Sequence, residues 1–163
     1  MIAEFLWVFE FSEDPAMPTR WGRAVLRPLV EVRPIGPQGT SEKVFALIDP
    51  GTESTLIMRW LAQDTGAVVN PDLSTRRGMG GESISAAPAD VDLRFGPSDV
   101  SEDQWHQWNA EVGVVHRWRA VWPIVLGQRG SFDEFTVTMN RHAQMLAVTA
   151  REDFDQRFSS PTN

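Results

Sequence analysis

A short apolar run that ends at a turn sets the strongest constraint on how this chain can fold. Val44-Phe-Ala-Leu-Ile48 contains no polar side chain, and Asp49-Pro50-Gly51 follows it directly. Five residues are too few for a helix of ordinary length, but they suit a strand that is buried on both faces. Such a strand needs neighbours beside it and covering layers above and below, so the run predicts the interior of a sheet.

The rest of the chain repeats short strand-like patterns between prolines and glycines. Five segments have the residue types or the alternation of strands: Phe5–Phe11, Arg23–Arg33, Ala89–Phe95, Val112–Val115 and Ala120–Leu126. A final hairpin is predicted from Thr136–Met139 and Gln144–Thr149. Helix signals are few. Trp60–Gly66 fits one or two turns ended by a glycine cap, and Ser131–Phe135 fits a short helix.

The segments between these elements predict loops and an overall architecture. Pro34–Thr40 and Arg76–Ser83 have the glycine and proline content of hairpin turns, and the acidic stretch Gly96–Asn109 is interpreted as a surface insertion. Many short strands with little helix favour a single, mainly β domain over residues 1–163, built as a small barrel or orthogonal sandwich. We expect its core at about residues 23–150 and a frayed tail at 152–163.

Composition excludes several classes of function. The net charge is -7 and Lys43 is the single lysine, so no basic face is available for nucleic acid. Cysteine is absent and the histidines are scattered, which argues against disulfides, thiolate nucleophiles, metal sites and metal cofactors. No apolar run is long enough to cross a membrane, and the N-terminus lacks the pattern of a signal peptide. These features predict a cytoplasmic protein without a membrane partner.

Asp49 is the main candidate for chemistry. The apolar strand before it would deliver its carboxylate to the rim of a barrel. Gly51 allows the backbone to turn sharply there, so its N–H can approach the carboxylate. Asp-Pro-Gly is also a frequent β-turn tripeptide, and taken alone it favours an ordinary turn.

Three segments, in order along the chain, resemble motifs of the retropepsin-like aspartic peptidases. Ala46–Ile57 is similar to the active-site loop of that family, in which apolar residues precede Asp-Thr-Gly-Ala. Gly78-Met-Gly-Gly81 is similar to the glycine-rich flap that closes over the substrate. Trp122–Gly127, followed by Arg129–Val137, is similar to the Leu-Gly element and the short helix and strand near the end of the domain. The resemblance implies a closed acid-protease-type β-barrel with a flap hairpin and one or two short helices.

The same resemblance implies a homodimeric aspartic endopeptidase that acts on a peptide or protein substrate without a cofactor. Each copy would contribute one catalytic Asp49, and the two carboxylates would share a proton and activate a water. The chain carries one such motif, so the second carboxylate would come from another copy across a two-fold axis. The implied supporting residues are Pro50, Gly51 and Thr52 in the active-site loop, Gly78, Met79, Gly80 and Gly81 in the flap, and Leu126 and Gly127 beneath the loop.

A second aspartate matches the family's literal string better. Asp64-Thr-Gly-Ala67 follows Trp60-Leu-Ala-Gln, which has the pattern of an amphipathic helix rather than of an apolar strand. It also lies too close to the glycine-rich segment to leave room for the elements between them. We therefore predict that Asp64 lies at the end of a helix and takes no part in the site.

Pro50 departs from the family pattern, which has threonine or serine at this position. Proline offers neither a hydroxyl nor a backbone N–H, so it cannot make the hydrogen bonds that stiffen paired loops across a dimer. Thr52 carries a hydroxyl where alanine is usual, but we expect it to point in the wrong direction for a simple exchange. Three hypotheses remain open. They are an active peptidase, an inactive peptide-binding or dimerisation module of the same fold, and an unrelated small barrel that binds a ligand.

Overall fold

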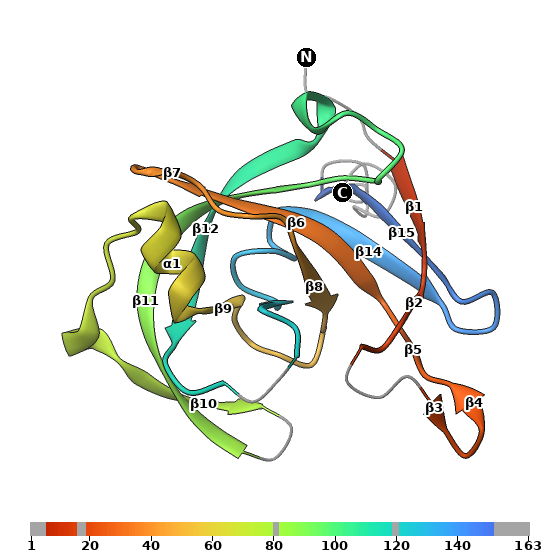
Figure 1. Cartoon of the computed structure of the whole chain (residues 1–163), viewed down its shortest axis with the longest axis horizontal. Helices are drawn as coiled ribbons and strands as arrows, with labels where there is room; N and C mark the ends of the chain where they lie inside the picture. Colours follow the sequence, from red (N-terminus) through yellow and green to blue (C-terminus); the bar gives the residue numbers. More distant parts are fainter. Residues whose placement is uncertain (1–5, 16–18, 80–81, 119–120, 152–163) are drawn as a thin grey trace, which may run out of the picture.

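The computed structural model describes residues 6–15, 19–79, 82–118 and 121–151 (Figure 1). The described chain is mainly β. Its strands are β1 Leu6–Glu10, β2 Ser12–Glu13, β3 Thr19–Arg20, β4 Arg23–Ala24, β5 Leu26–Arg27, β6 Leu29–Gly36, β7 Gly39–Thr40, β8 Val44–Ile48, β9 Leu56–Met58, β10 Thr75–Met79, β11 Glu82–Phe95, β12 His106–Val115, β13 Ile124–Leu126, β14 Phe135–Asn140 and β15 Met145–Ala150. The helical elements are α1 Arg59–Thr65 and two single 3₁₀ turns, η1 Pro71–Leu73 and η2 Glu102–Gln104. The expected frayed tail at 152–163 lies outside the described residues.

Six strands close into a barrel in the order β11-β12-β9-β13-β8-β6, and β6 pairs with β11 to complete the ring. The longest ladder is antiparallel and joins β11 to β12, from Ala86↔Val115 to Phe95↔His106. The closing ladder between β6 and β11 runs from Asp92↔Ile35 to Phe95↔Val32. The prediction of a mainly β chain with a closed barrel is confirmed.

Strand β8 occupies the interior position that its sequence predicts. It lies between β6, its antiparallel neighbour, and β13, its parallel neighbour. Ala46 and Ile48 are buried inside the barrel, but Phe45 on the other face is 47% exposed. The prediction of burial on both faces is therefore wrong for Phe45, because a barrel covers the inner face of each strand and leaves part of the outer face open.

A second, three-stranded sheet packs against the barrel. It has the order β1-β15-β14, and the β14–β15 pair is the predicted final hairpin. Phe95 lies at the centre of the aromatic contacts, with ring centroids 5.1 Å from Trp7 and 5.0 Å from Phe135. Aromatic pairs in this distance range add to the stability that burial provides.

Helix α1 packs on the barrel beside β6, β9 and β12 and ends as its sequence predicts (Figure 1). Gly66 caps it in the left-handed conformation with φ 69°, and its backbone N–H donates to the carbonyl of Gln63. The second predicted helix, at Ser131–Phe135, is wrong. Those residues form successive turns before β14 begins at Phe135.

The predicted strand at Arg23–Arg33 is interrupted. Arg23–Ala24 pairs with Thr19–Arg20 in a hairpin, and Leu26–Arg27 pairs with Ser12–Glu13. The barrel strand β6 begins only after Pro28, which has no N–H to donate to a ladder. The β3–β4 hairpin lies away from the barrel at the lower right of Figure 1.

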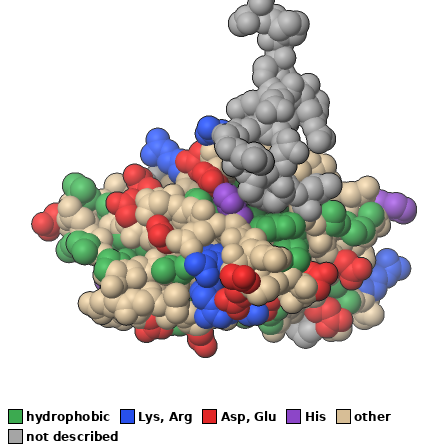
Figure 2. Space-filling view, turned by 90° about the horizontal axis from the view of Figure 1, so that it is seen from above, with side chains coloured by type: hydrophobic (Ala, Val, Ile, Leu, Met, Phe, Trp, Pro, Cys, Tyr) green, Lys and Arg blue, Asp and Glu red, His purple; other side chains and the backbone are tan. Residues whose placement is uncertain are grey.

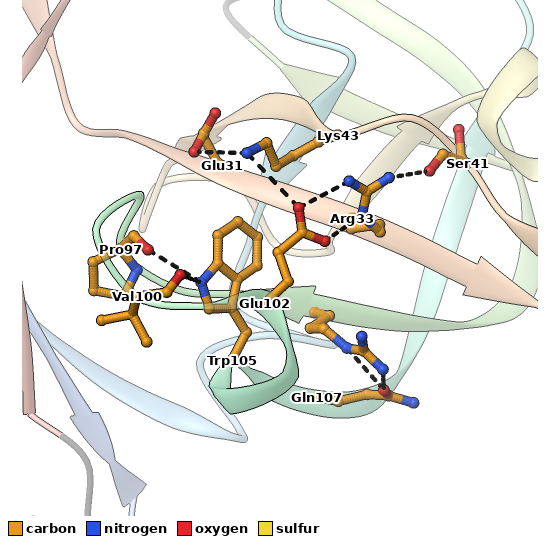
Figure 3. A network of polar contacts seen from close by, with 10 residues as sticks. Glu31, Arg33, Ser41, Lys43, Pro97, Val100, Glu102, Trp105 and Gln107 are labelled. Carbon is orange, nitrogen blue, oxygen red and sulfur yellow. Dashed lines mark hydrogen bonds and ion pairs between the residues drawn. The ribbon is translucent and has the colours of Figure 1, made fainter.

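The predicted surface insertion at Gly96–Asn109 is wrong in its second half. His106–Asn109 belong to β12, and Trp105 and Trp108 are each only 5% exposed. The true connection is shorter and is fastened to β6 by a bidentate ion pair between Arg33 and Glu102, with N–O distances of 2.6 and 2.9 Å (Figure 3). The Trp105 indole N–H donates to the carbonyls of Pro97 and Val100.

The same ion pair shifts the pKa of both partners. The hydrogen bonds from Arg33 lower the pKa of the Glu102 carboxyl, and Lys43 adds a smaller effect of the same sign. Glu102 in turn raises the pKa of Arg33. Lys43 also pairs with Glu31 on β6 at 3.4 Å, so the network joins three segments of the chain (Figure 3).

The surface in Figure 2 carries acidic and basic side chains intermingled rather than in separate fields. No helix within the described ranges is long and apolar enough to cross a membrane.

Candidate active site

Asp49 lies immediately after β8, at an edge of the barrel where two parallel strands end. Its backbone N–H donates to the carbonyl of Leu126, the last residue of β13, at 3.0 Å. Strand β13 lies between β8 and β9, the two strands that the Asp49 loop connects. The loop therefore passes over the end of β13, and the sheet itself determines where the carboxylate emerges.

Two donors from the same loop hold the carboxylate of Asp49. The Gly51 N–H donates to Oδ1 at 2.9 Å, and the Thr52 hydroxyl donates to Oδ2 at 2.6 Å. Hydrogen bonds to an ionised acceptor are short and strong, so together they fix the orientation of the group. Asp49 is half-buried, and an ionised carboxylate has about four acceptor positions, so it retains sites for further donors.

The partner of the Thr52 hydroxyl is a structural finding, because the sequence predicts only that this hydroxyl points in the wrong direction for a simple exchange with the one that Pro50 lacks. Thr52 is only 4% exposed, and its hydroxyl faces the aspartate of its own chain. It therefore serves as an internal support for Asp49, and it does not replace the hydroxyl that Pro50 lacks at the neighbouring position.

The segment after β13 is joined to the Asp49 loop along its length. Backbone N–H groups of Gln128 and Arg129 donate to the carbonyls of Thr52 and Glu53, each at 2.9 Å. The Gln128 side chain also donates to the carbonyl of Pro50 at 2.9 Å. Two loops that are distant in sequence thus form one hydrogen-bonded unit.

Gly127 permits this close approach. A Cβ atom at this position would lie 2.5 Å from the carbonyl oxygen of Ser54, which is backbone and cannot move aside. The Gly127 N–H donates to the Thr55 hydroxyl at 3.2 Å, and that hydroxyl shares a 2.7 Å hydrogen bond with Ser131. Leu126, just before Gly127, is fully buried beneath the loop.

Sequence reasoning missed Thr55 and Ser131. Both are fully buried and polar, and each satisfies the other. Their only signal in the sequence is a hydroxyl residue beside an apolar strand, and that signal does not identify the partner. The pairing depends on how the two loops meet in space.

The described part of the glycine-rich segment lies in a hairpin, as predicted. Gly78 and Met79 belong to β10 and pair with Ser83 and Glu82 of β11, while Gly80 and Gly81 lie outside the described residues. At the root of the hairpin, Ala86 shares a buried cluster with Leu56, the first residue of β9, and Ile84 packs against that cluster. The hairpin therefore starts beside the chain that leaves the Asp49 loop.

Asp64 lies in a different environment. It is exposed on α1 and accepts a hydrogen bond from the Ser41 hydroxyl at 3.4 Å. The prediction that it ends a helix is confirmed.

The described residues contain no group of three or more His, Asp or Glu side chains that could hold a metal ion. The hydrogen bonds described above fix one carboxylate at this edge of the barrel, that of Asp49. Such a group can accept a proton from a bound water and can hydrogen-bond a second acid.

Comparisons with known proteins add little to this geometry. No protein-family model matches the chain, and no curated protein matches it in sequence. Among solved structures, a retropepsin-like aspartic protease from Rickettsia conorii is similar with 10% identity and a TM-score of 0.49, over 91% of this chain and 94% of the other.

Proposed function

We propose that the chain is one half of a homodimeric aspartic endopeptidase whose active site contains one Asp49 from each copy. The observation that carries this proposal is the fixed carboxylate of Asp49, held through both oxygens by Gly51 and Thr52 at the end of a barrel strand. The Gly51 bond is an Asx-turn of the kind that ordinary turns also make, so the weight of the proposal falls on the second donor, the 2.6 Å bond from the buried Thr52 hydroxyl.

The requirement for two copies follows from the chemistry. Within the described part of the chain, the hydrogen-bond donors to the Asp49 carboxylate are Gly51 and Thr52, and neither is an acid. Hydrolysis by an aspartate pair needs one carboxylate as base and one carboxylic acid as proton donor. A two-fold axis near the loop would bring a second Asp49 to the first and make the pair symmetric.

In this proposal the two carboxylates share one proton, since like charges about 3 Å apart cannot both ionise. The ionised carboxylate takes a proton from a water molecule as the water oxygen attacks the scissile carbonyl carbon. The protonated partner donates its proton to the carbonyl oxygen. Gly51 and Thr52 keep each carboxylate oriented while its proton is exchanged.

The proposed substrate is an extended peptide that lies beneath the β10–β11 hairpin. That hairpin starts at the cluster that Ala86 forms with Leu56, beside the exit of the Asp49 loop. An extended peptide could hydrogen-bond to the backbone there and place its side chains alternately on the two sides. Gly78 and Met79, with Gly80 and Gly81, are proposed to cover it.

Digestion of a peptide library between pH 4 and 7 tests the proposal. The wild-type chain should cleave, and Asp49→Asn should reduce cleavage to background because asparagine can neither take nor give the proton. Asp64→Asn is a matched control, since it makes the same substitution in the chain's other Asp-x-Gly sequence. Equal cleavage by wild type and Asp49→Asn, or none by either, would sink the enzymatic proposal.

One observation favours a second candidate, an inactive peptide-binding or dimerisation module of the same architecture. Pro50 is exposed and offers no hydroxyl or N–H to a partner loop, and the Thr52 hydroxyl is already engaged by its own Asp49. Under this alternative the wild-type chain binds peptides without cleaving them. Pro50→Thr would then produce new cleavage, and fluorescence anisotropy with labelled peptides would report equal binding by wild type and Asp49→Asn.

A further inference from the structure

The tip of the β3–β4 hairpin carries an unusual residue. Trp21 and Gly22 form its two-residue turn with φ angles of 52° and 71°, and Arg20 pairs with Arg23 across it. Positive φ at both central positions defines the type I′ turn, which favours asparagine followed by glycine. A bulky residue in the left-handed region is strained, so tryptophan is an unfavourable choice for the turn itself.

No part of the described core compensates for that choice. The Trp21 side chain is 88% exposed and packs on no part of the core. Its contact is with the Arg20 guanidinium, which lies 4.3 Å from the ring centroid. A strained backbone that presents a large aromatic ring to solvent points to a role outside the folded chain. Tryptophan and arginine are also the residues most enriched at the centres of protein interfaces.

A pocket with complementary chemistry lies between β1 and the barrel. Its volume is about 540 Å³, within the range of ligand pockets and larger than one indole ring. Val8 and Phe45 line it and are 50% and 47% exposed, which is unusual for large apolar side chains. Glu10 and Asp99 also line it and are exposed, so the pocket combines apolar walls with carboxylates.

The position of this pocket indicates which molecule fills it. The paired strands β2 and β5 connect the β3–β4 hairpin to the rest of the chain, and we call these four strands the arm. Ser12, the first residue of β2, lines the pocket, so the pocket lies at the root of the arm. When two such arms cross antiparallel about a two-fold axis, the tip of each arm reaches the root of the other. The same root lies next to the candidate active site, because the carbonyl of Pro28, one residue after β5, accepts the N–H of Ile48 at 3.0 Å.

We propose that the β3–β4 hairpin is a dimer arm, in which Trp21 of each copy inserts into the Val8–Phe45 pocket of a second copy of this chain. Arg20 and Arg23 then face Glu10 and Asp99 of that copy, in a chain whose net charge of -7 otherwise opposes self-association. Reciprocal exchange about a two-fold axis closes the assembly as a dimer. The inference rests on the homodimer of the proposed function but not on peptide cleavage.

Sedimentation equilibrium of the full chain tests the arm. Trp21→Asn removes the ring and leaves Asn-Gly, the most favourable pair for a type I′ turn, so the hairpin itself is preserved. We expect this variant to raise the dimer dissociation constant by about tenfold or more, as loss of an interface anchor does. An unchanged dissociation constant would overturn the proposal, as would a Trp21-dependent attachment to anionic lipid vesicles with unchanged dimerisation.

Cross-linking tests the receiving pocket. The chain has no cysteine, so mixing an Arg23→Cys variant with an Asp99→Cys variant allows mixed disulfides only between copies. The control pair is Arg23→Cys with Asp72→Cys, because Asp72 lies on η1 and does not line the pocket. We expect the Arg23→Cys and Asp99→Cys pair to cross-link faster than this control. Equal rates for the two pairs would overturn the assignment of the pocket.

The outcomes separate this inference from the proposed function. Both assays need no cleavage and can be repeated with Asp49→Asn chains. A dimer that depends on Trp21 but cleaves nothing supports the arm and contradicts the peptidase. A peptidase whose dimerisation is insensitive to Trp21 contradicts the arm alone.

Discussion

Two aspartates in this chain precede a glycine by two residues, and their surroundings differ. The Gly51 N–H donates to the carboxylate of Asp49, whereas the Gly66 N–H donates to the Gln63 carbonyl and caps α1. Asp49 follows a barrel strand and is half-buried, while Asp64 is exposed on a helix. The element before the tripeptide therefore decides whether the glycine N–H donates to the aspartate or to a backbone carbonyl. Asp64-Thr-Gly66 is closer to the literal Asp-Thr-Gly string, but it lies at the end of a helix rather than after a strand.

The largest expected difference between the two regions concerns their glycines. Gly127→Val should destabilise the fold by about 3 kcal/mol or more, because the added atoms meet backbone atoms of Ser54 and Thr52 that cannot yield. Gly66→Ala should cost less, about 1–2 kcal/mol for the strain of a left-handed alanine plus the displacement of the Gln38 side chain, whose Cγ and Cβ would clash with the added atom but are not backbone. Urea denaturation measures both, and equal losses would contradict the distinction.

Two fully buried threonines provide the next comparison. Thr55→Val should cost about 2 kcal/mol, because it leaves the Gly127 N–H and the Ser131 hydroxyl without their partner. Thr65→Val should cost well under that, about 0.5–1 kcal/mol, because the hydroxyl of Thr65 donates to carbonyls of α1 that the helix and its cap also engage. A cost at Thr65 as large as that at Thr55 would show that the buried hydroxyls are equivalent.

Removing the side-chain donor to each aspartate should change the free energy of unfolding by a smaller amount. Thr52→Val should destabilise the chain by about 1.5 kcal/mol, because its 2.6 Å hydrogen bond to Asp49 is charge-assisted and nearly buried. It should also lower peptide cleavage, since Asp49 would lose one of its two fixed contacts. Ser41→Ala removes a 3.4 Å contact to an exposed Asp64, and no measurable change in stability or cleavage is expected. The comparison fails if both substitutions act alike.

Lowering the pH should produce the smallest change in the free energy of unfolding. The titration also checks that the chain stays folded over the pH range of the cleavage assays. Arg33 lowers the pKa of Glu102 below the ordinary value of 4.5, so the ion pair contributes its full stability above that value. The contribution is lost as the pH falls through the lowered pKa. We expect the contribution of this ion pair to the free energy of unfolding of the wild type to stay constant from pH 7 to 5 and to fall only in stronger acid. The free energy of unfolding of Glu102→Gln should fall less over the same acid range. A decline of equal size in both would assign the acid sensitivity to another group.

Much of the fold follows from local sequence. The apolar run before Asp49 gives β8, the Leu61-Ala62 pattern with Gly66 gives a capped helix, and the last two strands are evident from their alternation. These elements form from propensity, periodicity and capping, which a sequence displays directly.

The remainder depends on contacts between distant segments. His106–Asn109 become a strand because β11 pairs with them, and Trp105 is buried because the connection before it is fastened to β6 through Glu102 and Arg33. Neither effect is encoded locally.

The candidate site shows the same division. Asp49 and Gly51 follow from the strand and turn pattern, and the close packing at Gly127 is consistent with its glycine. The Thr52 hydroxyl bond and the Thr55–Ser131 pair depend on the path of two loops in space. A sequence identifies residues capable of these bonds but not the partner that each one meets.

Mixed dimers test the central claim most directly. Wild-type chains are equilibrated with an equal amount of Asp49→Asn chains, and peptide cleavage is measured at fixed total protein. If each active site needs Asp49 from both copies, random pairing leaves about one quarter of the dimers active, and cleavage falls to about one quarter of the wild-type value. An equal mixture with Asp64→Asn should retain full cleavage. Retention of about one half with Asp49→Asn would mean that each copy works alone, and it would contradict the shared aspartate pair.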